Sequence, residues 1–393
     1  MRTRYALKAA VLFLAIAANT SAWAQAGDGF AAGDWRIYPT IGLSLRHDSN
    51  VALTETQETD SLVTQISPGV RAETGSDRSR LSASYQAEVA RYSDSGRDDF
   101  DDHRINLDWL YNPVLRHAIG VDASWKRGHD QRGTASREGD LALLALDPDS
   151  YDQTRFGGNY RFGAPGARGR IELGAHYQDL DYRNNRTFTR LRDRDDVTLD
   201  AAFFWRIAPK TSAVVSVDRI ETDYQFATLD STEHHYFVGI DFDATARTSG
   251  RLLFGRVEKD FEDPTRDDFS GTSWRAQLSY KLRSYSLLTL SSGRDTDETN
   301  GFGDFILRRD VTLGWSHQWN NRFSTTVDGG FANDRHGDSG RDEDTWFYGL
   351  SAQYQFRPWL NLGAGYRDYQ RNSDQAGFDF DRQEWLLSLE ASF

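Results

Sequence analysis

From Trp35 to Phe393 the sequence alternates apolar and polar residues in segments of about ten residues, and this period of two most constrains the fold. The stretch 197–201, for example, reads Val-Thr-Leu-Asp-Ala. Side chains of a β-strand point alternately to two faces, so each segment predicts a strand with one apolar face. Helical spacing does not fit these windows. About eighteen such segments follow one another, which predicts an all-β protein.

The breaks between the predicted strands are of two kinds, and the two kinds interleave along the chain. One set is short and rich in turn residues: Asn112-Pro113, 163–166, 208–210, Leu282-Arg283, Asn320-Asn321 and Arg357-Pro358. The other set is longer, acidic and polar: 47–61, 93–102, 128–150, 183–195, 226–233, 260–268, 294–303, 333–344 and 371–378. A β-sandwich or propeller has no reason to sort its loops in this way, whereas a transmembrane barrel has short periplasmic turns and longer extracellular loops. We therefore predict a transmembrane, antiparallel, up-and-down β-barrel of about 18 strands with both termini periplasmic.

Aromatic residues and hydropathy agree with a barrel in a membrane. Phe, Trp and Tyr make up 13% of the chain. Trp35, Trp109, Trp205, Trp319 and Trp359 fall at the predicted periplasmic strand ends, where aromatic girdles meet the bilayer interface. After the N-terminal segment no run of eighteen apolar residues occurs, which excludes spanning helices. The alternative interpretation is a soluble sandwich with ordinary core aromatics.

The N-terminus predicts export. Residues 1–24 read as a signal peptide, with a basic start, an apolar stretch from Ala9 to Ala18, and a small-residue cleavage pattern ending near Ala24. An uncleaved anchor is the alternative. Residues 25–34 then form a short periplasmic segment, and residues 35–393 form the barrel. The chain contains no cysteine, so it forms no disulfide. We expect the mature protein in the outer membrane of a Gram-negative cell.

The predicted last strand has one apolar face, formed by Trp385, Leu387, Leu389 and Phe393. In hydrocarbon no strand edge can stay unpaired, so we expect this strand to pair with the first one. An alternating strand that ends in Phe also resembles the signal that the barrel assembly machinery reads. That machinery, outer-membrane lipid and lipopolysaccharide are therefore expected partners.

Polar and charged residues fill the other strand face, which we expect to surround an aqueous lumen. The predicted pore-lining residues are Arg155, Arg161, Arg206, Arg251, Arg275, Asp122, Asp200 and Asp241. Either cations and anions pair across the wall and hold water, or Arg155, Arg161, Arg206 and Arg275 line a constriction for an acidic or hydroxyl-rich solute. The pattern indicates no catalytic residue, metal site or cofactor.

Other features are less regular. Pro39 and Pro68 fall inside the first two strands, where the missing N–H is awkward, so we expect each near the periplasmic rim or at a bulge. The apolar segment 141–146, in the longest loop, predicts a short helix or strand folded into the lumen, or else a loop-packing patch. The acidic loop runs 94–102 and 336–344 suggest solvated surface more than a divalent-cation site, since their spacing matches no calcium loop.

At Asp48, Ser49, Asn50 and Val51 the sequence resembles the putative β-barrel porin 2 family, in which a first strand leads into an Asp-Asp/Ser-Asn-Val/Ile turn. His47 stands where that pattern commonly has an aromatic residue. The resemblance implies an outer-membrane porin for exopolysaccharide export, with separate periplasmic polysaccharide-export components as possible partners.

Other functions compete with export. A general or sugar-selective diffusion porin is the main alternative. An outer-membrane enzyme would need a clustered nucleophile and base, but the nine histidines are scattered and no nucleophile motif appears. A TonB-dependent receptor would need a plug domain before Trp35 and more strands. The net charge of -13 indicates no nucleic-acid partner.

Overall fold

A computed structural model describes residue 27 and residues 29–393. The predicted signal peptide and its cleavage site near Ala24 lie outside the described residues. The described chain forms one sheet of nineteen strands. The strands are β1 (Phe30–Ala32), β2 (Trp35–Asp48), β3 (Ser61–Gly75), β4 (Ser79–Tyr92), β5 (Phe100–Val114), β6 (His117–Asp130), β7 (Asp149–Phe162), β8 (Gly169–Tyr182), β9 (Arg194–Ala208), β10 (Thr211–Tyr224), β11 (Ser231–Phe242), β12 (Thr248–Phe261), β13 (Phe269–Arg283), β14 (Ser286–Glu298), β15 (Phe305–Gln318), β16 (Phe323–His336), β17 (Asp342–Arg357), β18 (Leu360–Ser373) and β19 (Phe380–Ser392).

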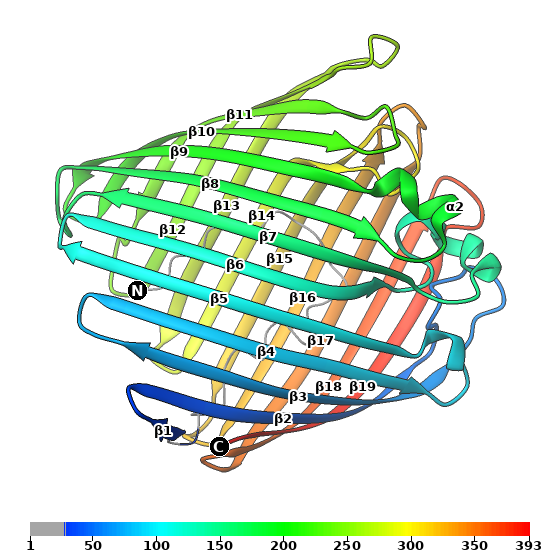
Figure 1. Cartoon of the computed structure of the whole chain (residues 1–393), viewed down its shortest axis with the longest axis horizontal. Coiled ribbons are helices and arrows are strands. Elements are labelled where there is room, and N and C mark those ends of the chain that lie inside the picture. The colour runs from blue at the N-terminus through cyan, green and yellow to red at the C-terminus, as the bar shows by residue number, and fades with distance from the viewer. Residues whose placement is uncertain (1–26, 28) are drawn as a thin grey trace.

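The sheet closes into a barrel (Figure 1). Each strand from β2 onward pairs antiparallel with the next strand in the chain, and β19 pairs with β2, so eighteen strands remain in the ring when the short β1 is set aside. Closure leaves no unpaired edge among these strands, which a wall in hydrocarbon requires. The predicted closed antiparallel barrel of about 18 strands is confirmed.

The two faces of the wall differ as the alternation requires. Apolar side chains point outward and are exposed, such as Trp385 at 59% and Leu387 at 60%, whereas the inner face is polar. Residues directly opposite each other on paired strands share a face, so the strand pairing shows which residues face inward and which face outward around the whole ring. Among the described residues, no helix has both the length and the apolar character that a membrane crossing needs. The helices of the described residues are short and lie in the loops: η1 (Gly96–Asp98), η2 (Ala135–Arg137), η3 (Gly139–Leu144), α2 (Arg186–Thr189) and η4 (Arg190–Arg192).

The two ends of the barrel also differ. The turn end has the connections 76–78, 115–116, 163–168, 209–210, 243–247, 284–285, 319–322 and 358–359. The loop end has 49–60, 93–99, 131–148, 183–193, 225–230, 262–268, 299–304, 337–341 and 374–379, and it lies on the right in Figure 1.

Several predicted breaks lie elsewhere in the structure. Asn112-Pro113 and Leu282-Arg283 belong to β5 and β13, because irregularities in the ladder carry these strands past them to the turns 115–116 and 284–285. The predicted loop 294–303 begins only at residue 299, because β14 continues to pair with β15 up to Glu298.

The two prolines have different surroundings. Pro39 lies near the turn end of β2, where its carbonyl accepts a hydrogen bond from the Phe393 N–H at 3.0 Å. Pro68 lies in the middle of β3, where Ser67 and Pro68 have no partner in β4 although the register continues unchanged on either side. The prediction of a rim or bulge position is therefore wrong for Pro68. Its missing N–H interrupts the ladder toward β4, while the pairing with β2 persists.

Candidate functional site

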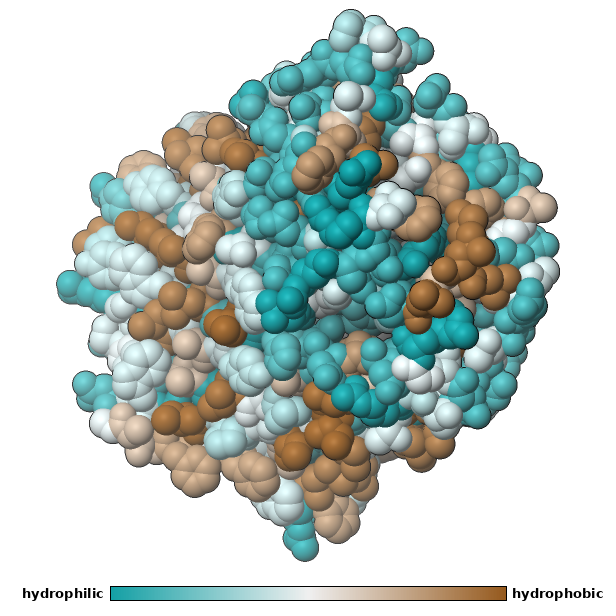
Figure 2. Space-filling view, turned by 45° about the vertical axis from the view of Figure 1, so that its right-hand side comes forward, coloured by the Kyte–Doolittle hydropathy of each residue, from teal (hydrophilic) through white to brown (hydrophobic). Residues whose placement is uncertain are grey.

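All eight predicted pore-lining residues lie on the inner face of the wall. Asp122 on β6 is opposite Gly157 on β7. Arg155 and Arg161 lie on the same face of β7 as Gly157. Asp200 lies opposite Asp218, and Asp241 lies opposite Arg251. The hydrophilic side chains that surround the barrel mouth gather in the centre of Figure 2, with apolar side chains at the flanks.

One group of inner-face charges is paired. Arg251 donates from Nε to Asp241 Oδ2 at 3.0 Å, and its guanidinium lies 5.1 Å from the centre of the Phe204 ring. Arg170 stacks on the same ring at 3.9 Å and contacts Glu172 at 3.0 Å. These groups lie toward the turn end. Their pairing fits the interpretation in which charges cross-link the wall and hold water.

Arg275 is also engaged. Its guanidinium contacts Asp218 at 2.7 Å and Asp295 at 2.9 Å, and it lies 4.5 Å from the centre of the Phe237 ring. Two carboxylates therefore neutralise this arginine. Arg275 supports the inner wall more than it offers a free cation to a solute.

Arg155, Arg161 and Arg206 differ from Arg275, because within residue 27 and residues 29–393 no carboxylate lies at ion-pair distance from any of them. Arg155 donates from Nε to Gln178 Oε1 at 2.7 Å. Arg161 and Arg206 lie close to the turn end of β7 and β9, whereas Arg155 and Arg275 lie midway along their strands. The structure therefore does not bring the four arginines into one ring.

Carboxylates form a band on the side of the lumen that β5 to β10 line. Asp108 on β5 is opposite Asp122 on β6, and Asp200 on β9 is opposite Asp218 on β10. Between the two pairs, His176 on β8 lies 3.7 Å from Asp200. We call Asp108, Asp122, Asp200 and Asp218 the acidic band. On β5 and β6 it lies closer to the turn end than Arg104 and Lys126, which face each other on the same two strands.

The tip of the β14–β15 hairpin bends into the lumen. β14 pairs with β13 only as far as Arg294, yet it pairs with β15 up to Glu298. Beyond Arg294 the side chain of Glu298 accepts hydrogen bonds from Lys259 at 2.7 Å and Tyr224 at 2.9 Å. Lys259 and Tyr224 lie on the inner face of β12 and β10, so the tip must lie inside the barrel. The strand period alone places Glu298 outside, and no sequence signal indicates the bend.

The loop 131–148 between β6 and β7 spans part of the mouth, and we call it the lid loop. Its Glu138 binds Arg341 and lies 3.5 Å from Arg371. These arginines precede β17 and lie in β18, and five strands (β19 and β2 to β5) separate β18 from β6 in the ring. The lid loop therefore reaches well around the mouth.

Three further loops hold the lid loop. Arg132 forms a two-pronged ion pair with Asp98 in the loop 93–99, with 2.6 Å between Nη2 and Oδ2, and both side chains are buried. Asp140 accepts a hydrogen bond from Thr56 Oγ1 at 2.7 Å and donates its backbone N–H to the Gly377 carbonyl at 2.8 Å. These contacts tie the lid loop to the loops 49–60, 93–99 and 374–379.

The apolar segment 141–146 belongs to this lid loop, and its residues 141–144 are part of η3. Ala142 and Ala145 are buried, whereas Leu144 and Leu146 are exposed at 73% and 80%. The segment thus contains a short helix, as one of the predicted alternatives stated, whereas its insertion into the lumen stays a prediction. The lid loop contacts other loops at the mouth and the loop-end termini of β17 and β18.

The acidic loop runs are less solvated than predicted. Asp98 is buried against Arg132, and His336 and Glu343 are buried beside Arg341 and the lid loop. Two sets of metal-ligand types occur in the described part of the chain: Glu138, His336 and Glu343; and Glu233, His235 and Asp295. Arg341 and Arg371 contact the first set, and Lys259 and Arg275 contact the second. Both sets thus take part in ion-pair networks with arginine or lysine side chains.

The motif Asp48 to Val51 lies at the loop end of the seam where the barrel closes. Asp48 is fully buried and accepts two hydrogen bonds from Arg382 on β19, one at 3.0 Å. The Ser49 N–H donates to the Gln383 carbonyl at 3.0 Å, and the Gln383 N–H donates to Ser49 Oγ at 2.8 Å. Asn50 Nδ2 donates to the Thr54 carbonyl at 2.8 Å and closes the turn. Val51 is buried and its carbonyl accepts a hydrogen bond from Gln131 of the lid loop at 2.7 Å. The motif therefore joins the first strand, the last strand and the lid loop.

Comparisons with known proteins agree with this architecture. No curated protein matches the sequence. Among solved structures, Pseudomonas aeruginosa OpdO is 15% identical with a TM-score of 0.52, and the match covers 92% of this chain and 97% of that one. Pseudomonas aeruginosa OccK5 (OpdH) is 11% identical with a TM-score of 0.51, covering 93% and 99%. Acinetobacter baumannii OccAB4 is 9% identical with a TM-score of 0.50, covering 92% and 98%. These identities indicate a shared fold alone. The model of the family described as putative beta-barrel porin 2 matches residues 24–393.

Proposed function

The chain belongs to the putative beta-barrel porin 2 family, and from this premise we propose that it is an outer-membrane channel for the selective diffusion of small polar solutes. A closed barrel with a polar inner face and an apolar outer face supports a conduit through a membrane. The observation that carries the proposal is the lumen itself, where unpaired cations and an acidic band face the same aqueous space.

Small solutes fit this lumen better than a polymer does. The lid loop spans part of the mouth on buried ion pairs, and the β14–β15 tip occupies part of the interior. A polysaccharide in transit would need a continuous wide path and would have to displace both elements. Exopolysaccharide export, which the family resemblance implied, has no support in the comparisons, and diffusion replaces it as the proposed function.

The charges support weak selection by sign. Arg155, with Arg104 and Lys126 nearby on the inner face, forms a basic region on the loop side of the acidic band. A solute that crosses the lumen meets the two signs in succession. A zwitterion or a hydroxyl-rich solute satisfies both regions, whereas a simple ion is favoured by one and repelled by the other.

Planar-bilayer recordings of the purified protein in a salt gradient test the proposal. We expect a small, steady conductance with a reversal potential near zero. Arg155→Gln should shift the ion preference toward cations by about twofold, and Asp122→Asn should shift it toward anions by a similar factor. Arg256→Gln is the matched control, because it removes the same charge from the outer face, where Arg256 pairs with Glu258 at 2.7 Å.

Three results would contradict the proposal. Absence of conductance from correctly folded protein would exclude a diffusion channel. Equal reversal potentials for the wild type, Arg155→Gln and Asp122→Asn would show that ions do not pass these residues. Block by a long acidic polysaccharide but not by small zwitterions would favour export instead.

A further inference from the structure

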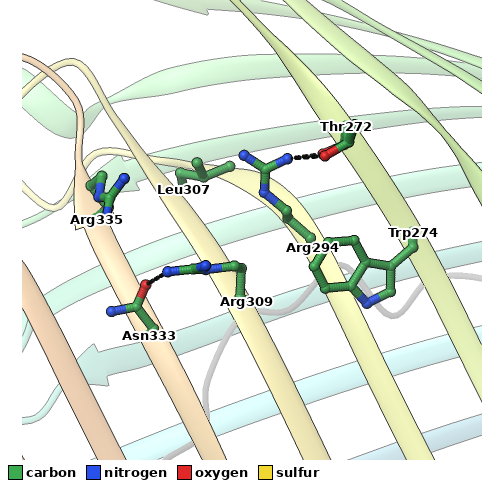
Figure 3. A pocket seen from close by; sticks show the side chains of 7 residues that line it. All are labelled: Thr272, Trp274, Arg294, Leu307, Arg309, Asn333 and Arg335. Carbon is green, nitrogen blue, oxygen red and sulfur yellow. Dashed lines mark hydrogen bonds between the residues drawn. The ribbon is translucent and has the colours of Figure 1, made fainter.

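The outer wall has a cavity of about 230 Å³ near the loop end of β13 to β16. Its lining side chains come from these four neighbouring strands, as Figure 3 shows. They are Thr272, Trp274, Arg294, Leu307, Arg309, Asn333 and Arg335. None of them belongs to the lumen, so the cavity is separate from the proposed pathway.

The inward bend of the β14–β15 tip explains why the wall is hollowed here. Above the pair Trp274 and Arg294, β14 no longer pairs with β13, so the edge of β13 loses its ladder partner. Arg294 donates from Nη1 to both the carbonyl and the hydroxyl of Thr272, so it satisfies one backbone carbonyl of that edge. The guanidinium thus lies in the gap that the departing strand leaves.

The cavity carries an excess of positive charge. Arg294 is opposite Arg309, and Arg309 is opposite Asn333, so like charges lie in one row across adjacent strands. In the described chain, Arg335 has an ion pair, with Asp342 at 3.0 Å, whereas Arg294 and Arg309 have no carboxylate at ion-pair distance. Two guanidinium groups therefore have no direct carboxylate partner: Arg309 reaches Asp344 only through Asn333. Like charges directly opposite each other, such as Arg294 and Arg309, are unfavourable.

The depth of the cavity is that of a membrane interface. Val311 and Phe331 are the next outward-facing residues from Arg309 and Asn333 toward the turn end, and they face the apolar zone. The centre of the Phe331 ring lies 5.2 Å from that of Trp346. Aromatic residues mark the level where acyl chains give way to headgroups. The arginine row lies immediately above this level, on the loop side, where Arg309 and Arg335 are exposed.

We propose that this cavity binds a phosphate group of a phosphorylated glycolipid in the outer leaflet. Guanidinium groups bind phosphate oxygens through paired hydrogen bonds, and a phosphate here would neutralise the repulsion between Arg294 and Arg309. Trp274 and Leu307 provide an apolar surface for the adjoining part of the lipid. The interface excludes part of the water, which strengthens these charge interactions relative to those in solution.

The test compares binding of two glycolipid probes to the full-length protein in lipid nanodiscs, followed by native mass spectrometry. The probes are lipid A with its two phosphates and the same lipid after enzymatic dephosphorylation. We expect the phosphorylated form to bind at least about tenfold more tightly, and Arg309→Gln to remove most of this preference. Arg309→Lys should retain an intermediate preference, since it keeps the charge but loses the fork of donors.

Arg256→Gln is again the control, because Arg256 also faces outward and pairs opposite Thr272. Its carboxylate partner Glu258 leaves no unneutralised charge, so the control should behave as the wild type. The proposal is overturned if both lipids bind equally, or if Arg309→Gln and Arg256→Gln reduce binding alike. Complete displacement of the glycolipid by millimolar inorganic phosphate would also overturn it, because the site would then belong to a free anion.

Discussion

Replacing Asp48 by Asn should strongly destabilise the closed barrel. Asp48 is fully buried at the seam between β2 and β19 and accepts hydrogen bonds from Arg382 and from the Asn50 N–H. Glu384 lies 2.6 Å from Arg46 and 2.8 Å from Arg382. The cluster thus contains two carboxylates and two guanidinium groups. The Asn variant leaves the buried Arg382 and the half-buried Arg46 to share one carboxylate.

The expected loss follows from that imbalance. Removing one partner of a buried ion pair costs about 3–5 kcal/mol, because the other charge stays buried without compensation. Asn has nearly the shape of Asp, so packing changes little and the loss reports on charge. The double variant Asp48→Asn/Arg382→Gln restores one carboxylate to one guanidinium, Glu384 to Arg46. We expect it to be more stable than Asp48→Asn alone.

Urea unfolding of the protein in lipid vesicles, followed by tryptophan fluorescence, measures these free energies. Asp60→Asn is the matched control in the adjacent loop, because its side chain is 76% exposed and its nearest ionic partner is His47 at 3.7 Å. The control should unfold as the wild type does. The reasoning is refuted if Asp48→Asn matches the control, or if the double variant is less stable than the single one.

Three other predictions concern the mouth and the inward hairpin. Glu138→Gln should loosen the lid loop by removing its charge pairing with Arg341, and single-channel recordings should show a larger conductance than in the wild type. An unchanged conductance would mean that the lid loop does not limit ion flow. Gly133→Ala should disturb the same loop, because Gly133 has a φ of +80° and a Cβ there would lie 1.8 Å from the Ala52 carbonyl oxygen. The disturbed loop should be cleaved faster by protease within residues 131–148, and a wild-type cleavage rate would contradict the clash. Lys259→Met should destabilise by about 3–5 kcal/mol, since Glu298 would lose its buried cation, and urea unfolding that matches the wild type would show that the tip is held by other contacts.

The sequence could predict the features that depend on residues close together in the chain, but not those that depend on contacts between distant segments. The class, the closed antiparallel wall and the number of strands follow from local patterns, because each strand facing lipid must place apolar residues at every second position. The inward orientation of Arg155 and Asp122 follows from the same period. The motif from Asp48 to Val51 is visible in the sequence as a resemblance, but its physical reason is not, because Arg382 lies 334 residues away.

What the tertiary structure alone decided depends on contacts between distant segments. Glu298 lies on the outer face by strand period, yet it binds Lys259 inside the barrel, because the end of β14 separates from β13 and turns inward. Glu138 meets Arg341 across 203 residues, which no local pattern encodes. By itself the sequence determined the wall, since alternation is a property of each strand. Only the tertiary structure decided what narrows the lumen and hollows the outer surface, because both depend on where the ends of strands and loops meet in space.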